Sequence, residues 1–204
     1  MKNNRVTDMA ILSLFIAIEV VLTLTPLGFI QIGPIRSTTL HIPVILAGLL
    51  LGYKHAFSVG LVFGILSVLT NTFMPTPTSF IFSPFYSFGG FNGNMYSLVI
   101  AIIPRVLFGM ISLFVFNLLS KVNSTSIRVF ISACIGSICH TMMVMGGIYV
   151  FFGPQYALAK DVPLGELINL IYIVVTTNGI IEMLVGAFVV MGAYKTLEKV
   201  IRKR

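Results

Sequence analysis

The stretch "AIIPRVLFGM", residues 101–110, places an arginine inside an apolar segment, with at least nine uncharged residues on either side of Arg105. A guanidinium stays charged in proteins, and taking one out of water costs several kcal/mol. Ionisable residues inside membrane-length segments usually face the interior of a helix bundle or a wet cavity. Arg105 is therefore the first candidate for a functional side chain.

The composition around this stretch indicates an integral membrane protein. The chain has 204 residues, of which 57% are hydrophobic and 9% charged, with a mean hydropathy of +1.01. Soluble domains carry roughly a quarter charged residues. A core of this size cannot hide so much apolar surface, so the solvent must be lipid. No polar stretch is long enough to fold alone, and we predict a single membrane domain over residues 1–204.

The predicted fold is an all-α bundle of six transmembrane helices. The apolar segments of helical length cover residues 8–25, 40–52, 55–73, 95–120, 128–152 and 164–194. The second is too short to cross a bilayer at about 1.5 Å per residue, unless the residues before it re-enter the membrane. Glu19 interrupts the first segment and no small-residue cleavage site follows, so we interpret it as a retained helix.

The charge pattern predicts that both termini are cytoplasmic. With six helices, the termini, the turn at Lys54 and the 121–128 connection share one side, whereas the other side carries Arg36 and Lys160. The first side collects Lys2, Arg5, Lys54, Lys121, Arg128 and five basic residues of the tail. The net charge of +7 thus lies in short flanks of apolar segments, which is typical of topology signals and lipid headgroup contacts. This distribution argues against a nucleic-acid partner.

The long connections lie on the outer side, after the first and third helices. Residues 26–40 and 74–94 are rich in Pro and Gly, and the second loop also carries several aromatic residues. Loops of this length with apolar content of their own are usually lids or binding loops. The pattern indicates a site open to the exterior.

Several costly or polar side chains lie in the predicted spans, on faces shared with small residues. The three groups are Ala101, Arg105, Gly109 and Ser112; Gly136, His140, Met143 and Gly147; and Asn178, Glu182 and Gly186. Arg105 can pair with Glu182 or Glu19 and order the bundle, or it can bind an anionic group of a ligand through its planar fork. Both roles are compatible. His140 is either a core histidine or a ligand contact, and Asn178 is equally open.

The first helix carries a stripe of small residues at Ala10, Ser13 and Ala17, which lets another helix approach closely. Glu19 lies about 200° around the helix from Ala17, so the two residues point in opposite directions. One face then suits a partner and the other the bundle interior. The alternative is that the stripe packs within the same chain.

The sequence lacks the motifs of several active sites. No phosphate-binding loop, zinc-protease motif, nucleophile elbow or clustered Cys/His spacing occurs, so we expect no cofactor and no metal. An intramembrane enzyme using Arg105, His140 and Glu182 would lack a nucleophile. A secondary transporter would show an inverted repeat, which we do not find. If the chain transports, its energy comes from an ion gradient or another subunit.

Longer stretches resemble a known family. "GPIRSTTLHIPVILAGLLLGYKHAFSVGLVFGILSVL", "SLFIAIEVVLT", "IIPRVLFG" and "TTNGIIEMLVGAF" are similar, in this order, to the substrate-binding S components of energy-coupling factor (ECF) vitamin transporters. The resemblance covers nearly the whole chain. "TTLHIPVILAG" and "TPTSFIFSPF" look most like the pantothenate-type members, while other relatives bind hydroxymethylpyrimidine, folate or riboflavin.

The resemblance implies six helices with both termini inside, and a vitamin site near the outer side between the last three helices and the two long loops. It also implies docking through a small-residue stripe on the first helix onto a membrane coupling (T) subunit, with two ABC-type ATPases supplying the drive. Here Ser13 replaces an alanine of that stripe. The S component would topple in the membrane to carry its vitamin inward.

For pantothenate, which has a carboxylate, an amide and two hydroxyls, the resemblance predicts Arg105 as the anion clamp, about 15 Å below the outer end of its helix. Asn92 and Asn94 are predicted at the mouth of the site, with His140 and Asn178 at the depth of Arg105. The predicted lid is the aromatic loop with Phe80, Phe82, Phe85, Tyr86 and Phe88.

Overall fold

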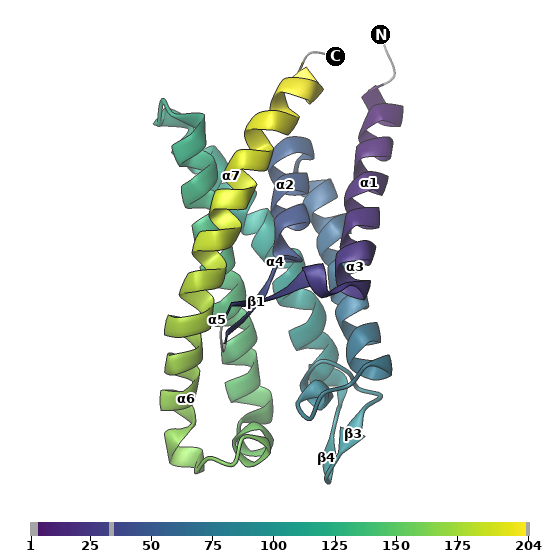
Figure 1. Cartoon of the computed structure of the whole chain (residues 1–204), viewed down its shortest axis with the longest axis vertical. Helices are drawn as coiled ribbons and strands as arrows, with labels where there is room; N and C mark the ends of the chain where they lie inside the picture. Colours follow the sequence, from purple (N-terminus) through teal and green to yellow (C-terminus); the bar gives the residue numbers. More distant parts are fainter. Residues whose placement is uncertain (1–3, 33–34, 203–204) are drawn as a thin grey trace.

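The computed structural model describes residues 4–32 and 35–202 as an all-α membrane bundle, confirming the predicted fold class (Figure 1). The helices are α1 (Asn4–Leu24), α2 (His41–Leu51), α3 (Tyr53–Phe73), α4 (Met95–Leu118), α5 (Thr125–Ala159), α6 (Leu167–Val174) and α7 (Ile180–Arg202). A π-helical turn, Val175–Gly179, joins α6 to α7, so the two form one long segment. Five segments of the described chain are long and apolar enough to cross a membrane, and α2 is not.

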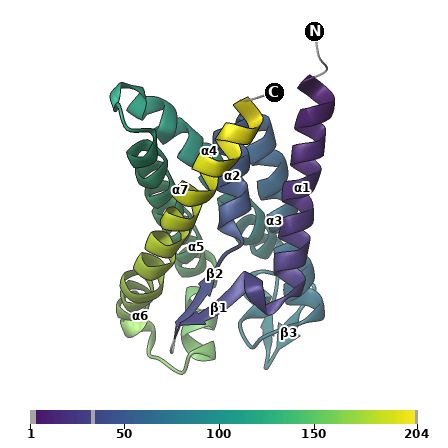
Figure 2. The ribbon, with the colours of Figure 1, turned by 45° about the horizontal axis from the view of Figure 1, so that its top comes forward.

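The chain reaches α2 through a β-hairpin. Strand β1 (Phe29–Ile32) pairs antiparallel with β2 (Ile35–Thr38), and Phe29 lies opposite Thr38. The hairpin crosses the molecule at mid-height, between α1 on one side and α5 and α7 on the other (Figures 1 and 2). The connection before the short helix α2 therefore lies about half-way along the molecule and not at one of its ends (Figure 1).

The two ends of the bundle differ. The start of α1, the end of α7 and the α4–α5 connection lie together at one end (Figure 1). The opposite end carries the short strands β3 (Ser87–Phe88) and β4 (Phe91–Asn92) and the connection from α5 to α6. The elaborate 74–94 loop is thus on the end away from the termini.

Helix α4 lies between α3 and α5 at very close range. A Cβ on Gly60 of α3 would overlap the carbonyl oxygen of Arg105 and come within 2.9 Å of the Val106 Cα. On the other side, a Cβ on Gly136 of α5 would overlap the Ser112 hydroxyl. Small residues allow this backbone contact between membrane helices. The α4 face of Arg105 is accordingly buried along its length.

Buried apolar residues form two cores. One core, toward the chain ends, includes Val44, Phe63 and Phe108. The other, toward the loop end, is built around Phe80 and Phe152.

Candidate functional site

A cavity of about 290 Å³ opens between α1, α3, α4 and α5, with Arg105 in its wall. Its lining residues come from several elements: Thr23, Thr38, Leu40, Phe63, Ser67, Thr70, Asn71, Met74, Thr76, Phe82, Arg105 and His140. Phe63 belongs to the first apolar core and Phe82 packs against the second. A cavity with apolar walls and a few convergent polar groups is the usual form of a small-molecule site. We call it the Arg105 cavity.

The residue before Arg105 explains how the guanidinium is held. Pro104 has no N–H, so it cannot donate to the carbonyl of Ile100 four residues earlier. The Arg105 Nη1 donates to that carbonyl instead, at 2.8 Å. Side chains on a helix lean toward its N-terminus, which gives Arg105 the reach. Pro104 thus leaves the buried Ile100 carbonyl without its usual backbone donor, and the Arg105 guanidinium donates to it instead.

Two aromatic rings complete the surroundings of this cation. The Arg105 Cζ lies 5.2 Å from the centre of the Phe63 ring and 5.3 Å from that of Phe82, both within cation–π range. The side chain is only 8% exposed, yet Nη1 is its one nitrogen with a hydrogen-bond acceptor in the described chain. The guanidinium therefore keeps free donors for a ligand anion.

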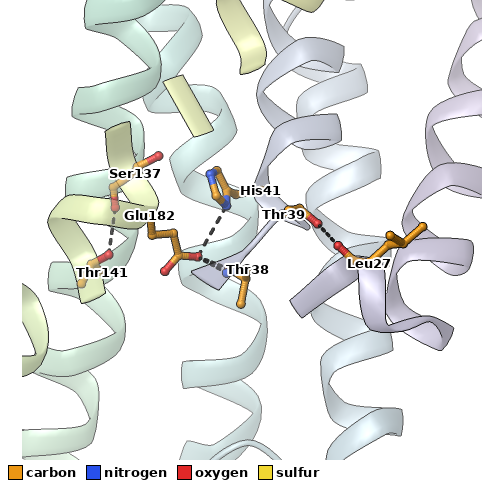
Figure 3. Close-up of polar contacts among 7 residues, drawn as sticks. All are labelled: Leu27, Thr38, Thr39, His41, Ser137, Thr141 and Glu182. Atoms are coloured by element: carbon orange, nitrogen blue, oxygen red, sulfur yellow. Dashed lines mark hydrogen bonds and ion pairs between the residues drawn. The ribbon is translucent and has the colours of Figure 1, made fainter. Parts of the chain in front are cut away.

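The predicted alternative partners of Arg105 do not pair with it. Glu19 is fully buried, and neither of its carboxyl oxygens has a hydrogen-bond partner among residues 4–32 and 35–202. Glu182 instead lies 3.6 Å from the His41 Nδ1 and accepts hydrogen bonds from Thr38 (Figure 3). The bundle-ordering ion pair of Arg105 with either acid is thus not formed.

The Glu182 carboxylate fastens the β1–β2 hairpin to α7. Its Oε1 accepts from the Thr38 backbone N–H at 3.2 Å and closely from the Thr38 hydroxyl. Its Oε2 makes no hydrogen bond within the described part of the chain. A Cβ on Gly186, one turn further along α7, would overlap the His41 Nε2, so the imidazole lies directly on the helix backbone. Glu182 holds Thr38 with one oxygen and keeps the other available.

Glu182 also lines a second cavity of about 180 Å³, the Glu182 cavity. It is lined by Thr38, His140, Thr141, Val144, Met145, Val174, Asn178, Gly179 and Glu182. Thr38 and His140 line both cavities, so the two adjoin at these residues. Together they present a cation on one side and a carboxylate on the other.

The structure divides the predicted substrate residues into two groups. Arg105 and His140 line the first cavity and Asn178 lines the second. Asn92 and Phe88 lie in the exposed β3–β4 hairpin, and Asn94 caps α4 by accepting from the Tyr96 N–H at 2.8 Å. Asn92, Phe88 and Asn94 line neither the Arg105 cavity nor the Glu182 cavity, and their role in binding stays a prediction.

Sequence analysis did not identify several residues that line the Arg105 cavity. Ser67, Thr70 and Asn71 fall at i, i+3 and i+4 on one face of α3, a polar stripe in an apolar helix that was a readable signal. Thr38 had no such signal, because its partner lies 144 residues away.

The small-residue stripe of α1 lies on the outside of the bundle. Ala10, Ser13 and Ala17 are exposed, and the Ser13 hydroxyl is turned back onto the Met9 carbonyl at 2.9 Å. Glu19, on the opposite face, is buried as the helix geometry predicted. The stripe therefore does not pack within this chain.

Comparisons with known proteins agree with this architecture. Residues 7–194 match the family model described as ECF transporter, substrate-specific component. The chain is 36% identical over 196 residues to the pantothenic acid transporter PanT of Lactococcus lactis subsp. cremoris (strain MG1363), covering 92% of this chain and 98% of that protein. Both matches are transport proteins and not enzymes, and they confirm the resemblance found in the sequence. The chain belongs to the family of ECF transporter substrate-specific components.

Proposed function

We propose that this protein captures pantothenate at the outer side of the membrane, for import by an ECF transporter. The family supports vitamin uptake, and the name of the Lactococcus lactis relative supplies the vitamin. The observation that carries the proposal is the buried Arg105 guanidinium with free donors in the wall of a 290 Å³ cavity.

The chemistry of the cavity suits a short hydroxy-amide acid. Arg105 takes the carboxylate, since a guanidinium presents two parallel N–H groups to it. Phe63 and Phe82 flank the apolar centre of the ligand, and His140 and Asn178 meet its amide and hydroxyls. Asn92, Asn94 and Phe88 would act at the mouth of the site, within the predicted lid.

The exposed α1 stripe is the proposed docking face for the T subunit, with two ABC-type ATPases beneath it. Ala10, Ser13 and Ala17 leave the α1 backbone open to a second helix, as close helix contacts in membranes require. The S component then topples to release the vitamin inside. The helix ends that lie together, those of α1 and α7, are proposed to face the cytoplasm.

Binding without ATP tests the proposal. The purified protein should bind pantothenate in isothermal titration calorimetry, and Arg105→Ala should weaken binding by about 2–5 kcal/mol because the buried carboxylate loses its partner. Asp161→Asn, a charge change in the exposed connection between α5 and α6, is the control and should bind normally. A silent titration against pantothenate and a panel of other vitamins refutes capture. Selective binding of another vitamin moves the substrate within the family.

A further inference from the structure

The proposed contact of Arg105 with the ligand carboxylate leaves the polar groups of the Glu182 cavity without a role. Its wall contains a carboxylate, the Asn178 amide and the Thr141 hydroxyl, in a membrane protein where burying polar groups is costly. The Thr141 hydroxyl is already turned to the Ser137 carbonyl at 3.1 Å, as Figure 3 shows. Glu182, Asn178 and His140, whose Nε2 has no hydrogen-bond partner among the described residues, are left to meet a ligand.

We propose that Glu182 determines specificity: it accepts hydrogen bonds from the uncharged hydroxyl end of the ligand and rejects ligands that carry negative charge there. This inference rests on the proposed function, because it assumes that the ligand carboxylate lies on Arg105. A ligand held there extends past Thr38 and His140, the residues shared by both cavities, and brings its other end to Glu182.

The contacts of Glu182 show that it acts as an acceptor. Both donors of Thr38 point to Oε1, and the His41 Nδ1 lies 3.6 Å from the same atom. Oε2 has no donor in the described residues, while the side chain is 21% exposed and lines the cavity. An ionised carboxylate accepts and cannot donate, so Oε2 suits a ligand hydroxyl.

The Thr38 hydroxyl shows the kind of donor that this carboxylate accepts. It donates directly to Glu182 from the edge of both cavities. A ligand hydroxyl can occupy the equivalent position on Oε2 without displacing Thr38. The hairpin contact and the ligand contact thus use different oxygens of one carboxylate.

The negative charge of Glu182 also disfavours binding of a negatively charged ligand group in the Glu182 cavity. A second negative charge near Glu182 meets like-charge repulsion in a low-dielectric site, which is a strong device for excluding wrong ligands. A carboxylate therefore fits the cavities in one orientation, toward Arg105. The ligands that fit are monoanions with a neutral hydroxyl end. A ligand of this class that is phosphorylated at that hydroxyl is excluded from the cavities.

The test compares two ligands on purified protein by calorimetry: pantothenate and its phosphate monoester at the primary hydroxyl. The wild-type protein should bind the ester at least about 100-fold more weakly. Glu182→Gln keeps the acceptor for Thr38 but removes the charge, and it should narrow this ratio at least about tenfold. Glu182→Asp retains the charge and should restore the discrimination. Glu166→Gln, the same change in an exposed residue bonded to Asn169, should leave the ratio unchanged.

A second variant guards against misfolding of Glu182→Gln, which size-exclusion chromatography would reveal. Asn178→Lys keeps Glu182 and adds a cation to the same cavity, so it should also narrow the ratio. An unchanged ratio in the folded charge variants overturns the inference, as does an ester that binds the wild-type protein as tightly as pantothenate. If the wild-type protein binds no pantothenate, the proposed function fails first and the inference falls with it.

Discussion

Replacing Pro104 by alanine tests how Arg105, the proposed anion clamp, is positioned. In the wild-type helix the Ile100 carbonyl has no backbone donor from residue 104 and accepts from the Arg105 Nη1 at 2.8 Å. Alanine restores the N–H, which then competes for this carbonyl. We expect the guanidinium to lose its fixed position and the affinity for pantothenate to fall.

The magnitude follows from the bond that is disturbed. A hydrogen bond that involves a charged group is worth about 1.5–3 kcal/mol, but a carbonyl can accept two bonds, so part of the contact survives. A loss of about 1–2 kcal/mol corresponds to roughly a 5–30-fold rise in Kd. Removing proline from a helix interior is favourable by about 3 kcal/mol, so the fold should not be weakened.

Calorimetry gives the Kd, and thermal unfolding in detergent reports the stability. Pro154→Ala makes the same change within α5, at an exposed position, and should leave binding unchanged. In an Arg105→Ala background, Pro104→Ala should have no further effect, because the group that it positions is gone. A folded Pro104→Ala protein with wild-type affinity, or an equal loss in both backgrounds, would refute the positioning role.

Two other substitutions address the hairpin anchor and the docking face. Gly186→Ala puts a methyl group into the His41 ring, so we expect a loss of about 1–3 kcal/mol in stability with weaker vitamin binding, whereas Gly192→Ala on the same helix meets open space and should be silent in both assays. Ala17→Trp should abolish uptake in cells while calorimetry still detects binding, and Val150→Trp, at an exposed position of α5, should preserve both; continued uptake by Ala17→Trp would place the docking face elsewhere.

The helices could be predicted because lipid leaves the backbone few choices. Every N–H and C=O in the hydrocarbon must be bonded within the segment, so a long apolar run becomes a helix. The prediction 55–73 corresponds to Tyr53–Phe73, and 95–120 to Met95–Leu118. The errors are at the ends: α5 continues to Ala159 and α7 to Arg202, beyond the predicted 152 and 194. Helices that emerge into water lose the hydropathy signal before they lose their hydrogen bonds.

The site was harder to predict, because its contacts join distant parts of the chain. The signal at Arg105 was local: a cation in an apolar span. Thr38 lay in a stretch interpreted as a loop, and only folding brings it to Glu182. Asn94 carried a local signal of another kind, which sequence analysis did not use. Its position directly before an apolar run, with Ser97 three residues later, is typical of a helix cap, and the structure forms that capping box.

The separation of Arg105 from Glu182 explains how a charged site can stay ready for a ligand. A buried ion pair would have to be broken before a carboxylate could bind, and breaking one typically costs about 3–5 kcal/mol. Here neither charge is paired with the other. Arg105 contacts the Ile100 carbonyl and the rings of Phe63 and Phe82. Glu182 contacts Thr38 and His41. Each keeps one side without a partner among residues 4–32 and 35–202. Because these free sides carry opposite charge, the proposed ligand, with an anionic end and a hydroxyl end, would satisfy both without displacing the contacts named above.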